Sequence, residues 1–262
     1  MTYNIKNGGR NGRTSGRLDH IASVINSVEP DVLGLQELGD LPAAGRMPEL
    51  AEAVRMRAFP ARSWFGQPVA ILVRPPGRVA GVAPVRRPFH HAAQRVVVGT
   101  TGGPLRVLCT HLFPYSGARR LVEARWAAAA CGRGPNQLTL LMGDLNTLDP
   151  WTDHRDRIRR LPPEYRSRHL RRASSTVDSR AVSALDRAGL VDLFRRAGEG
   201  EPETAPTRHG GGAEFSGMRL DYLFGTPALA ARTRRCTVLR GGVADVASDH
   251  YPVIGDIDLA FG

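Results

Sequence analysis

The sequence has little lysine, little cysteine and no long apolar run, and the last two shortages each argue against a class of protein. Lys6 is the only lysine among 262 residues, so nearly all of the positive charge is arginine. No apolar stretch reaches the roughly 18 residues that a membrane-spanning helix needs. The three cysteines, Cys109, Cys131 and Cys236, are odd in number, far apart and not at metal-ligand spacing, which argues against a disulfide framework or a zinc site.

What is present indicates one globular domain. Hydrophobic residues make up 42% of the chain, enough for a substantial core, and we expect residues 1–262 to form a single domain and a monomer. Cys109 alternates within an apolar strand pattern and is expected to point inward, and free buried thiols are typical of a reducing compartment. No secretory leader precedes the first strand, so we expect a cytoplasmic protein, and nothing indicates a protein partner.

The formal net charge of +11 has two interpretations. A strongly positive chain attracts polyanions such as nucleic acid. The chain is also rich in alanine, glycine and proline, and together with arginine this is the composition that a GC-rich genome produces. The three tryptophans, Trp64, Trp126 and Trp151, are too scattered to predict a stacking surface for single-stranded nucleic acid. The charge therefore gives nucleic acid only modest support.

Strand and helix patterns alternate along the chain, which predicts an α/β fold. Leu18, Ile21, Val24, Ile25 and Val28 recur at helical spacing. The expected helices cover residues 18–28, 48–57 and 119–130. The expected strands cover residues 1–5, 31–36, 69–73, 95–99, 105–109, 138–142, 220–224, 236–239 and 253–257.

Six short motifs stand at or just beyond the ends of these strands, or in the loops that follow, where sites on α/β scaffolds gather. They are MTYNI with Asn4, GLQEL with Glu37, CTHL with His111, MGDLN with Asp144 and Asn146, RLDY with Asp221, and SDHYP with Asp249 and His250. Their order and their position indicate that they meet in one site.

These residue types suit metal-assisted hydrolysis of a phosphoester. A phosphodiester is anionic, so its hydrolysis needs a cation near its oxygens and a water prepared for in-line attack. Carboxylate and amide oxygens are the ligands that hard divalent cations prefer, and Mg²⁺ takes only one or two protein carboxylates. We expect Glu37, Asn4 and Asp249 to supply that set.

The remaining residues suit the transfer of the proton and the stabilisation of charge. Asp144 can accept the proton of the attacking water. Asn146 lies two residues further on, on the same side of an extended segment, and can orient that water or hold a phosphate oxygen. His111 and His250 offer N–H groups to the developing charge, and Asp221 is the expected partner that orients His250.

Each motif alone also has a structural explanation. Asp144 and Asn146 favour turns, Asp249 and His250 fit a loop that enters the last strand, and Asn4 fits the end of a strand. Six such motifs in this order favour an active site over coincidence.

Together the motifs resemble those of the endonuclease/exonuclease/phosphatase superfamily, from Asn4 to His250. The resemblance implies the DNase I-like fold, a four-layer α/β sandwich in which two packed mixed β-sheets are flanked by helices. It also implies Mg²⁺ or Mn²⁺ as the cofactor and a phosphate-containing substrate. The implied metal ligands are Glu37, Asn4 and often Asp249, and the implied catalytic residues are Asp144, Asn146 and His250, with Asp221 bonded to His250.

The substrate depends on loops whose preference the motifs do not specify, and we favour a nuclease. GMRLDY resembles a stretch of abasic-site endonucleases, but Met218 replaces their bulky aromatic residue, and His111 stands where they usually carry tyrosine. One alternative is a phosphatase or phosphodiesterase for a small molecule or a lipid headgroup. The other is a non-catalytic binding module, which the complete residue set argues against.

Two irregular segments border these motifs. Residues 7–16 are glycine-rich and follow Asn4, which fits either a phosphate-binding loop or, as we prefer, an ordinary surface loop. Residues 152–179 are dense in arginine and follow Asn146. This segment fits a wall that grips the substrate as well as it fits an exposed charged helix.

Overall fold

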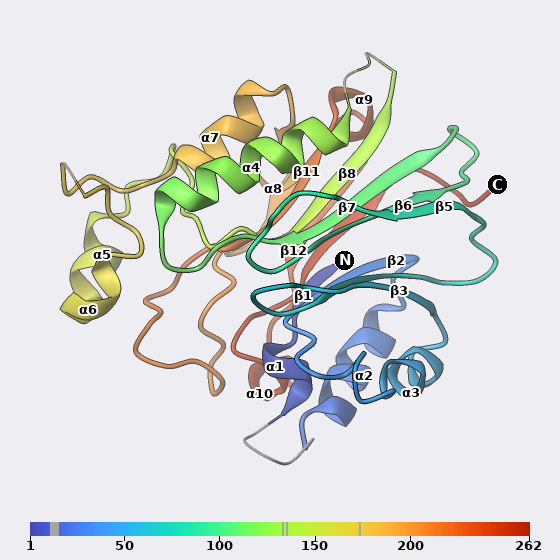
Figure 1. Ribbon diagram of the computed structural model, residues 1–262, viewed down its shortest axis with the longest axis horizontal. Coiled ribbons are helices and arrows are strands. Elements are labelled where there is room, and N and C mark those ends of the chain that lie inside the picture. Colours follow the sequence, from blue (N-terminus) through green and yellow to red (C-terminus); the bar gives the residue numbers. More distant parts are fainter. Residues whose placement is uncertain (11–15, 133, 135, 173) are drawn as a thin grey trace.

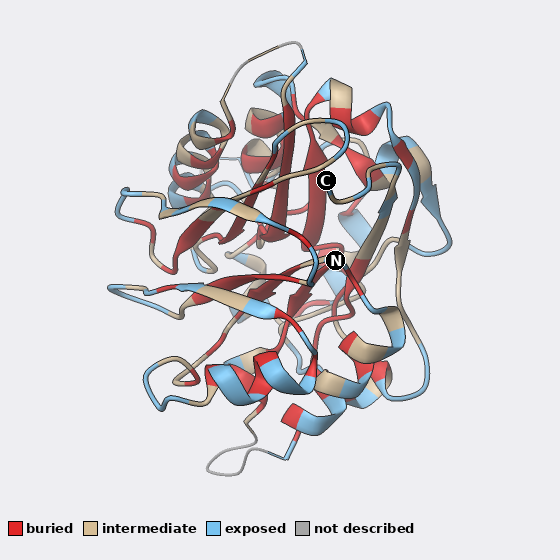
Figure 2. Cartoon of the chain, turned by 90° about the vertical axis from the view of Figure 1, so that its right-hand side faces the viewer, coloured by how far each residue is buried: buried red, intermediate tan, exposed pale blue. Residues whose placement is uncertain are grey.

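The computed structural model describes residues 1–10, 16–132, 134, 136–172 and 174–262. Two mixed β-sheets pack face to face, and helices cover the outer face of each (Figure 1). The strands are largely buried, whereas the helices alternate between buried and exposed positions (Figure 2). This is the four-layer sandwich that the motifs predict.

The seven-stranded sheet carries the strands from both ends of the chain. In spatial order its strands are β10 (Gly198–Glu199), β12 (Thr233–Val238), β13 (Val253–Ile257), β1 (Thr2–Asn4), β2 (Val32–Gln36), β4 (Val69–Val73) and β3 (Arg57–Ala61). β1 runs parallel to β2 and antiparallel to β13. The end of β1 therefore lies beside the end of β2, where Asn4 pairs with Gln36.

The six-stranded sheet comes from the middle of the chain. In spatial order it consists of β5 (Val79–Pro84), β6 (Ala93–Val98), β7 (Leu105–His111), β8 (Leu138–Asp144), β11 (Asp221–Gly225) and β9 (Val191–Asp192). β7 and β8 are parallel and end together, with His111 opposite Asp144. β11 is antiparallel to β8 and begins opposite the same residue, with Asp221 beside Asp144.

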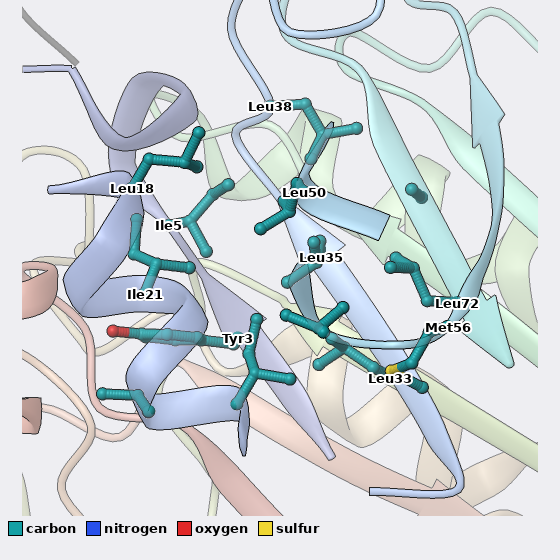
Figure 3. Close-up of a cluster of buried hydrophobic side chains, with 14 of the residues drawn as sticks. Tyr3, Ile5, Leu18, Ile21, Leu33, Leu35, Leu38, Leu50, Met56 and Leu72 are labelled. Atoms are coloured by element: carbon teal, nitrogen blue, oxygen red, sulfur yellow. The ribbon is translucent and has the colours of Figure 1, made fainter. Parts of the chain in front are cut away.

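Three main hydrophobic clusters fill the spaces between the four layers. On the outer face of the seven-stranded sheet, Tyr3, Leu33 and Leu35 meet α2 (Leu18–Val28), α3 (Met47–Ala53) and α10 (Ala244–Ala247), and part of this cluster appears in Figure 3. The second cluster lies between the sheets and includes Cys109. The third joins the six-stranded sheet to α4 (Gly117–Cys131) and α7 (Arg180–Arg187).

The remaining helices are short. They are α1 (Lys6–Gly9), α5 (Arg155–Arg160), α6 (Pro163–Arg166), α8 (Leu193–Ala197) and α9 (Pro227–Ala230). α5 and α6 stand away from the sheets at the left of Figure 1. None of the helices in the described part of the chain is both long and apolar enough to cross a membrane.

The structure adds several short elements to those predicted and corrects the bounds of others. The helix expected over residues 48–57 ends at Ala53, because the chain turns there and enters β3. β3 and β5 were not expected as strands. Both are edge strands with a proline and several exposed positions, so they lack the apolar runs that marked the central strands.

Candidate active site

Asp144 lies at the centre of the predicted site. Its Oδ2 accepts a hydrogen bond from Asn4 Nδ2 at 3.1 Å, and Asn4 Nδ2 also donates to Glu37 Oε1 at 3.0 Å. Asn4 and Glu37 belong to the seven-stranded sheet and its following loop, whereas Asp144 ends a strand of the other sheet. Asn4 therefore joins the two sheets at the point where their strands end.

The close approach of β7 and β8 places His111 beside Asp144. Gly143 precedes Asp144 with a φ of +142°, and a Cβ atom there would lie 1.8 Å from the carbonyl oxygen of Thr110. Only glycine fits this contact without displacing a strand. His111 Nε2 then lies 3.4 Å from Asp144 Oδ2 and 2.9 Å from Asn146 Nδ2.

Two of the predicted residues have left-handed backbones. Glu37 has a φ of +56° and Asn146 a φ of +49°, a region that residues other than glycine seldom adopt. At Asn146 the backbone N–H donates to Asp144 Oδ1 at 2.8 Å, which turns the asparagine side chain toward His111. Such backbone strain concentrates at functional sites.

His250 and Asp221 form a buried pair on the other side of Asp144. His250 Nδ1 lies 2.7 Å from Asp221 Oδ2, and His250 Nε2 points toward Asp144 Oδ2 at 3.9 Å. Burial alone would lower the pKa of His250, but the carboxylates of Asp221 and Asp144 raise it well above its ordinary value. His250 is therefore a cation that presents its second nitrogen to the centre of the site.

The same arrangement changes the acidity of Asp144. Burial, followed by the nearby charge of Asp221, raises the pKa of Asp144 to about 7. Asp144 is 2% exposed and is flanked by His111, His250 and Asn4. A carboxylate with a pKa near neutrality can both accept and release a proton at physiological pH.

Asp249 is connected to the site by contacts with Ser248 and Lys6. Ser248 Oγ donates to the carbonyl oxygen of Asn4 at 2.7 Å and contacts Asp249 Oδ1 at 3.4 Å. The other carboxylate oxygen, Oδ2, pairs with Lys6 Nζ at 2.9 Å. The structure thus brings all eight predicted residues together, and it adds the single lysine of the chain to their edge.

Gln67 and His91 also belong to this site, although no motif marked either residue. Gln67 Nε2 donates to Glu37 Oε2 at 3.0 Å, and the Gln67 backbone N–H donates to His91 Nδ1 at 2.8 Å. The His91 ring stacks on His111 with centroids 3.9 Å apart and planes at 7°. Because these contacts form only through folding, the sequence carries little signal for them.

Burial keeps the two stacked histidines neutral. It lowers the pKa of His111 to about 3 and, together with the neighbouring His111, lowers the pKa of His91 to about 2. On the far side of the site, the ring of Phe215 meets His250 edge-on with centroids 5.3 Å apart. The site therefore holds neutral imidazoles on one side and an imidazolium on the other.

The two irregular segments have structural roles in the parts that are described. In the glycine-rich stretch, the N–H groups of Asn7 and Gly8 bind Glu37, while residues 11–15 lie outside the described residues. In the arginine-dense segment, Arg155 pairs with Asp153 and Arg157 pairs with Glu203, so part of its charge is neutralised locally. These pairs favour the exposed charged surface over a substrate wall for that part of the segment.

The charges of the site fit a divalent cation. Among the described residues, the four carboxylates of Glu37, Asp144, Asp221 and Asp249 lie near the positive charges of Lys6, protonated His250 and Arg17. Among the residues that the structure describes, Glu37 has no cationic partner within salt-bridge distance, and Asp221 Oδ1 is buried without a hydrogen bond. Excess buried negative charge of this kind is stable only with a compensating cation.

Two sets of residues could hold that cation. Ligand atoms of Asp144, Asp221 and His250 lie within 4.8 Å of one another. However, the Asp221–His250 contact of 2.7 Å already has the geometry of a hydrogen bond, and imidazole is not a preferred ligand of Mg²⁺. Glu37, Asn4 and Asp249 offer only oxygen donors for this role, which suits a hard cation better.

Comparisons with known proteins agree with this arrangement. The model of the Endonuclease/Exonuclease/phosphatase family matches residues 1–250. No curated protein matches the sequence at a significant level.

Solved structures share the fold at low sequence identity. A functionally unknown conserved protein from Enterococcus faecalis is 15% identical, with a TM-score of 0.70 over 100% of this chain and 98% of that one. A mannosyl-6-phosphatase from Bacteroides thetaiotaomicron is 19% identical, with a TM-score of 0.70 over 99% and 98%. A humanized TDP2 from D. rerio is 19% identical, with a TM-score of 0.68 over 96% and 95%.

Proposed function

Because the chain belongs to the Endonuclease/Exonuclease/phosphatase family, it is a phosphoester hydrolase, and we propose that it cleaves phosphodiester bonds of nucleic acid with the help of Mg²⁺. The observation that carries the proposal is the position of Asp144. It is buried, it lies between a neutral and a charged histidine, and its pKa is raised to about 7. That is the environment of a general base for the attack of water.

Glu37, Asn4 and Asp249 are the residues that we assign to the cation, with Mn²⁺ as a possible substitute for Mg²⁺. When bound, the cation would neutralise phosphate oxygens and lower the barrier to attack. Asp249 would then exchange its contact with Lys6 for the metal, which leaves Lys6 near the anionic substrate.

The other residues provide proton transfer and charge stabilisation. Asp144 accepts a proton from water as the water oxygen attacks phosphorus and the opposite P–O ester bond breaks. Asn146 orients that water, since its backbone is fixed to Asp144. His250, held in its charged form by Asp221, donates its Nε2–H to the oxygens on which charge develops. The donor role expected of His111 requires a hydrogen on its Nε2, which faces the amide nitrogen of Asn146, so His111 takes that role only when the Asn146 amide is turned over.

A phosphatase for a small molecule is the second candidate. It is favoured by the similarity in fold to the mannosyl-6-phosphatase, which covers nearly the whole of both chains. The net charge of +11 favours nucleic acid instead, because a polyanion can use positive charge beyond the reacting phosphate.

We also propose that residues 1–262 act as one domain, as a monomer in the cytoplasm. The family match over residues 1–250 supports the first point. The three free cysteines are all buried, as is typical of proteins from a reducing compartment.

The test is cleavage of labelled oligonucleotides, both intact and with an abasic site, with Mg²⁺ and with EDTA. We expect cleavage that depends on the metal and falls by about 10²-fold or more in Asp144→Asn. Asp186→Asn, an exposed carboxylate on α7, is the matched control and should cleave normally. If no oligonucleotide is cut while a phosphomonoester is hydrolysed with Mg²⁺, the nuclease proposal is wrong and the small-molecule candidate replaces it.

A further inference from the structure

A groove with aromatic and cationic walls opens beside the active site. It has a volume of about 750 Å³ and lies between the loop that follows β3 and the loop that follows β5. Its distinctive lining residues are Arg62, Trp64, Phe65, Arg86, Arg87 and His91. None of the residues that line it is acidic.

The two aromatic residues are unusual for their exposure. Trp64 is 89% exposed and Phe65 is 68% exposed, whereas Trp126 packs against Phe89 and Trp151 lies under Arg195. The three tryptophans lie apart in the structure, in agreement with their scattered positions in the sequence. However, Trp64 and the neighbouring Phe65 together form an aromatic surface. Exposed large aromatic side chains next to a site favour a ligand with flat faces.

The loop that carries these aromatic residues is fixed in place. Ser63 Oγ donates to the carbonyl oxygen of His90 and accepts from the N–H groups of Phe65 and Gly66. At Gly66, a Cβ atom would lie 2.6 Å from His91 Nδ1, so the loop packs directly against the groove floor. The backbone that carries the two aromatic residues is thus held in position before any ligand arrives, which lowers the entropy cost of binding.

The arginines of the groove differ from those of the arginine-dense segment. Arg155 and Arg157 pair with carboxylates, but for Arg62, Arg86 and Arg87 no ion pair exists within the described part of the chain. All three are exposed. Unpaired cations that line a groove without acidic residues favour a ligand that carries several negative charges.

His91 connects the groove to the catalytic residues. This residue lines the groove and stacks on His111, whose centroid is 3.9 Å away. A ligand in the groove is therefore separated from His111 by the ring of His91. A substrate with a single phosphate carries its charge at the reacting group alone and would leave the three arginines without a partner, whereas a polymer has further phosphates for them.

We propose that this groove binds the single-stranded nucleic acid next to the scissile phosphate, with bases stacked on Trp64 and Phe65 and phosphates paired with Arg62, Arg86 and Arg87. The inference rests on the proposed nuclease function. Because base stacking is independent of sequence, the groove gives a preference for single strands without a preference for particular bases.

The first experiment measures binding of a fluorescent single-stranded oligonucleotide at several salt concentrations, in EDTA to prevent cleavage. In Arg86→Ala/Arg87→Ala, two phosphate contacts are lost, so the slope of log affinity against log salt should become shallower by about 1.4. The matched control is Arg187→Ala/Arg196→Ala, which removes the same charge from exposed positions on α7 and α8. Its slope should stay close to that of the unchanged protein.

The second experiment separates stacking from charge. Trp64→Ala should weaken binding of the oligonucleotide by about 10-fold, while Trp64→Phe, which keeps a ring, should restore most of the loss. The rate on bis(p-nitrophenyl) phosphate, a diester too small to fill the groove, should stay the same in all of these variants because the catalytic residues are unchanged.

The outcomes of the two proposals are distinct. If the unchanged protein hydrolyses no oligonucleotide, the nuclease function is refuted. If it cleaves single strands but the groove variants bind and cleave them equally well, the groove inference alone is refuted. Binding of phosphatidylserine vesicles that is lost in Trp64→Ala, with oligonucleotide cleavage unaffected, would overturn it in favour of a membrane surface.

Discussion

Replacing Asp221 with asparagine tests whether this carboxylate acts through His250. The two side chains are 0% and 4% exposed, and their contact is 2.7 Å long. Asparagine keeps the size of the residue but removes its charge. Burial, which by itself lowers the pKa of His250, would then be opposed only by more distant carboxylates, so the imidazole would lose its proton at a lower pH.

The size of the effect follows from the type of bond. A hydrogen bond to a charged group contributes about 1.5–3 kcal/mol, and each 1.36 kcal/mol changes a rate tenfold. We therefore expect Asp221→Asn to lower kcat by about 10- to 150-fold at neutral pH. The loss should be smaller in acid, where His250 regains its proton.

The assay is the pH profile of kcat/KM on a chromogenic diester with saturating Mg²⁺. In the unchanged protein, activity should fall in acid as Asp144 takes up a proton below about pH 7, and again when the pH rises past the raised pKa of His250. In Asp221→Asn the fall of activity at high pH, the basic limb of the profile, should move to lower pH. The Mg²⁺ concentration that gives half of the maximal rate should stay the same. His250→Asn should cost a similar factor, and adding Asp221→Asn to it should cost little more, because the two residues act as one unit.

Two results would refute this reasoning. A uniform loss of activity with an unmoved basic limb would mean that Asp221 does not set the protonation of His250. A large rise in the Mg²⁺ requirement of Asp221→Asn would instead place Asp221 among the metal ligands, as its proximity to Asp144 and His250 also allows.

Three further predictions concern other parts of the molecule. Glu37→Gln should raise the half-saturating Mg²⁺ concentration by about 10-fold or more. The measurement is the hydrolysis rate as a function of Mg²⁺ concentration, and an unchanged curve would exclude Glu37 as a metal ligand. Gly143→Ala should lower the free energy of unfolding, measured in urea, by about 2 kcal/mol or more, because the added Cβ would meet the carbonyl oxygen of Thr110. A variant as stable as the unchanged protein would mean that β7 and β8 can separate at little cost. Burial lowers the pKa of His169 to about 3, so between pH 6.5 and 3 the unfolded chain binds a proton that the folded one does not, and stability falls as the pH falls through that range. In His169→Asn the slope of unfolding free energy against pH near pH 5 should decrease by up to about 1.4 kcal/mol per pH unit, and an equal slope would contradict the buried neutral imidazole.

The strand-end residues were predictable because their local sequence is distinctive. A charged or amide side chain that directly follows an apolar strand, as at Glu37 and Asp144, needs partners, and parallel neighbouring strands bring such ends together. The alternation of elements predicted an α/β fold, and the family resemblance carried by the motifs implied the sandwich. The metal ligands and the catalytic roles stay predictions.

Other features could not be predicted because they depend on packing between distant segments. His91 and Gln67 have no motif, and their place beside His111 and Glu37 follows only from how the β3–β4 and β5–β6 loops meet. The edge strand β5 alternates half-buried and exposed residues and ends in proline, so its sequence reads like that of a loop. In the same way, nothing near Trp64 in the sequence marks Arg86 and Arg87 as residues that share its groove.

The bond between Asn4 and Asp144 spans 140 residues and joins one sheet to the other. His250, which completes the site, comes later still, and its partner Asp221 lies on the sheet that Asn4 does not belong to. A chain that is still being made on the ribosome, surrounded by RNA, therefore carries no assembled site until residue 250 has emerged and the sheets have docked. Hydrolysis is delayed by topology alone, and we expect activity to appear during refolding only with the last step of tertiary assembly.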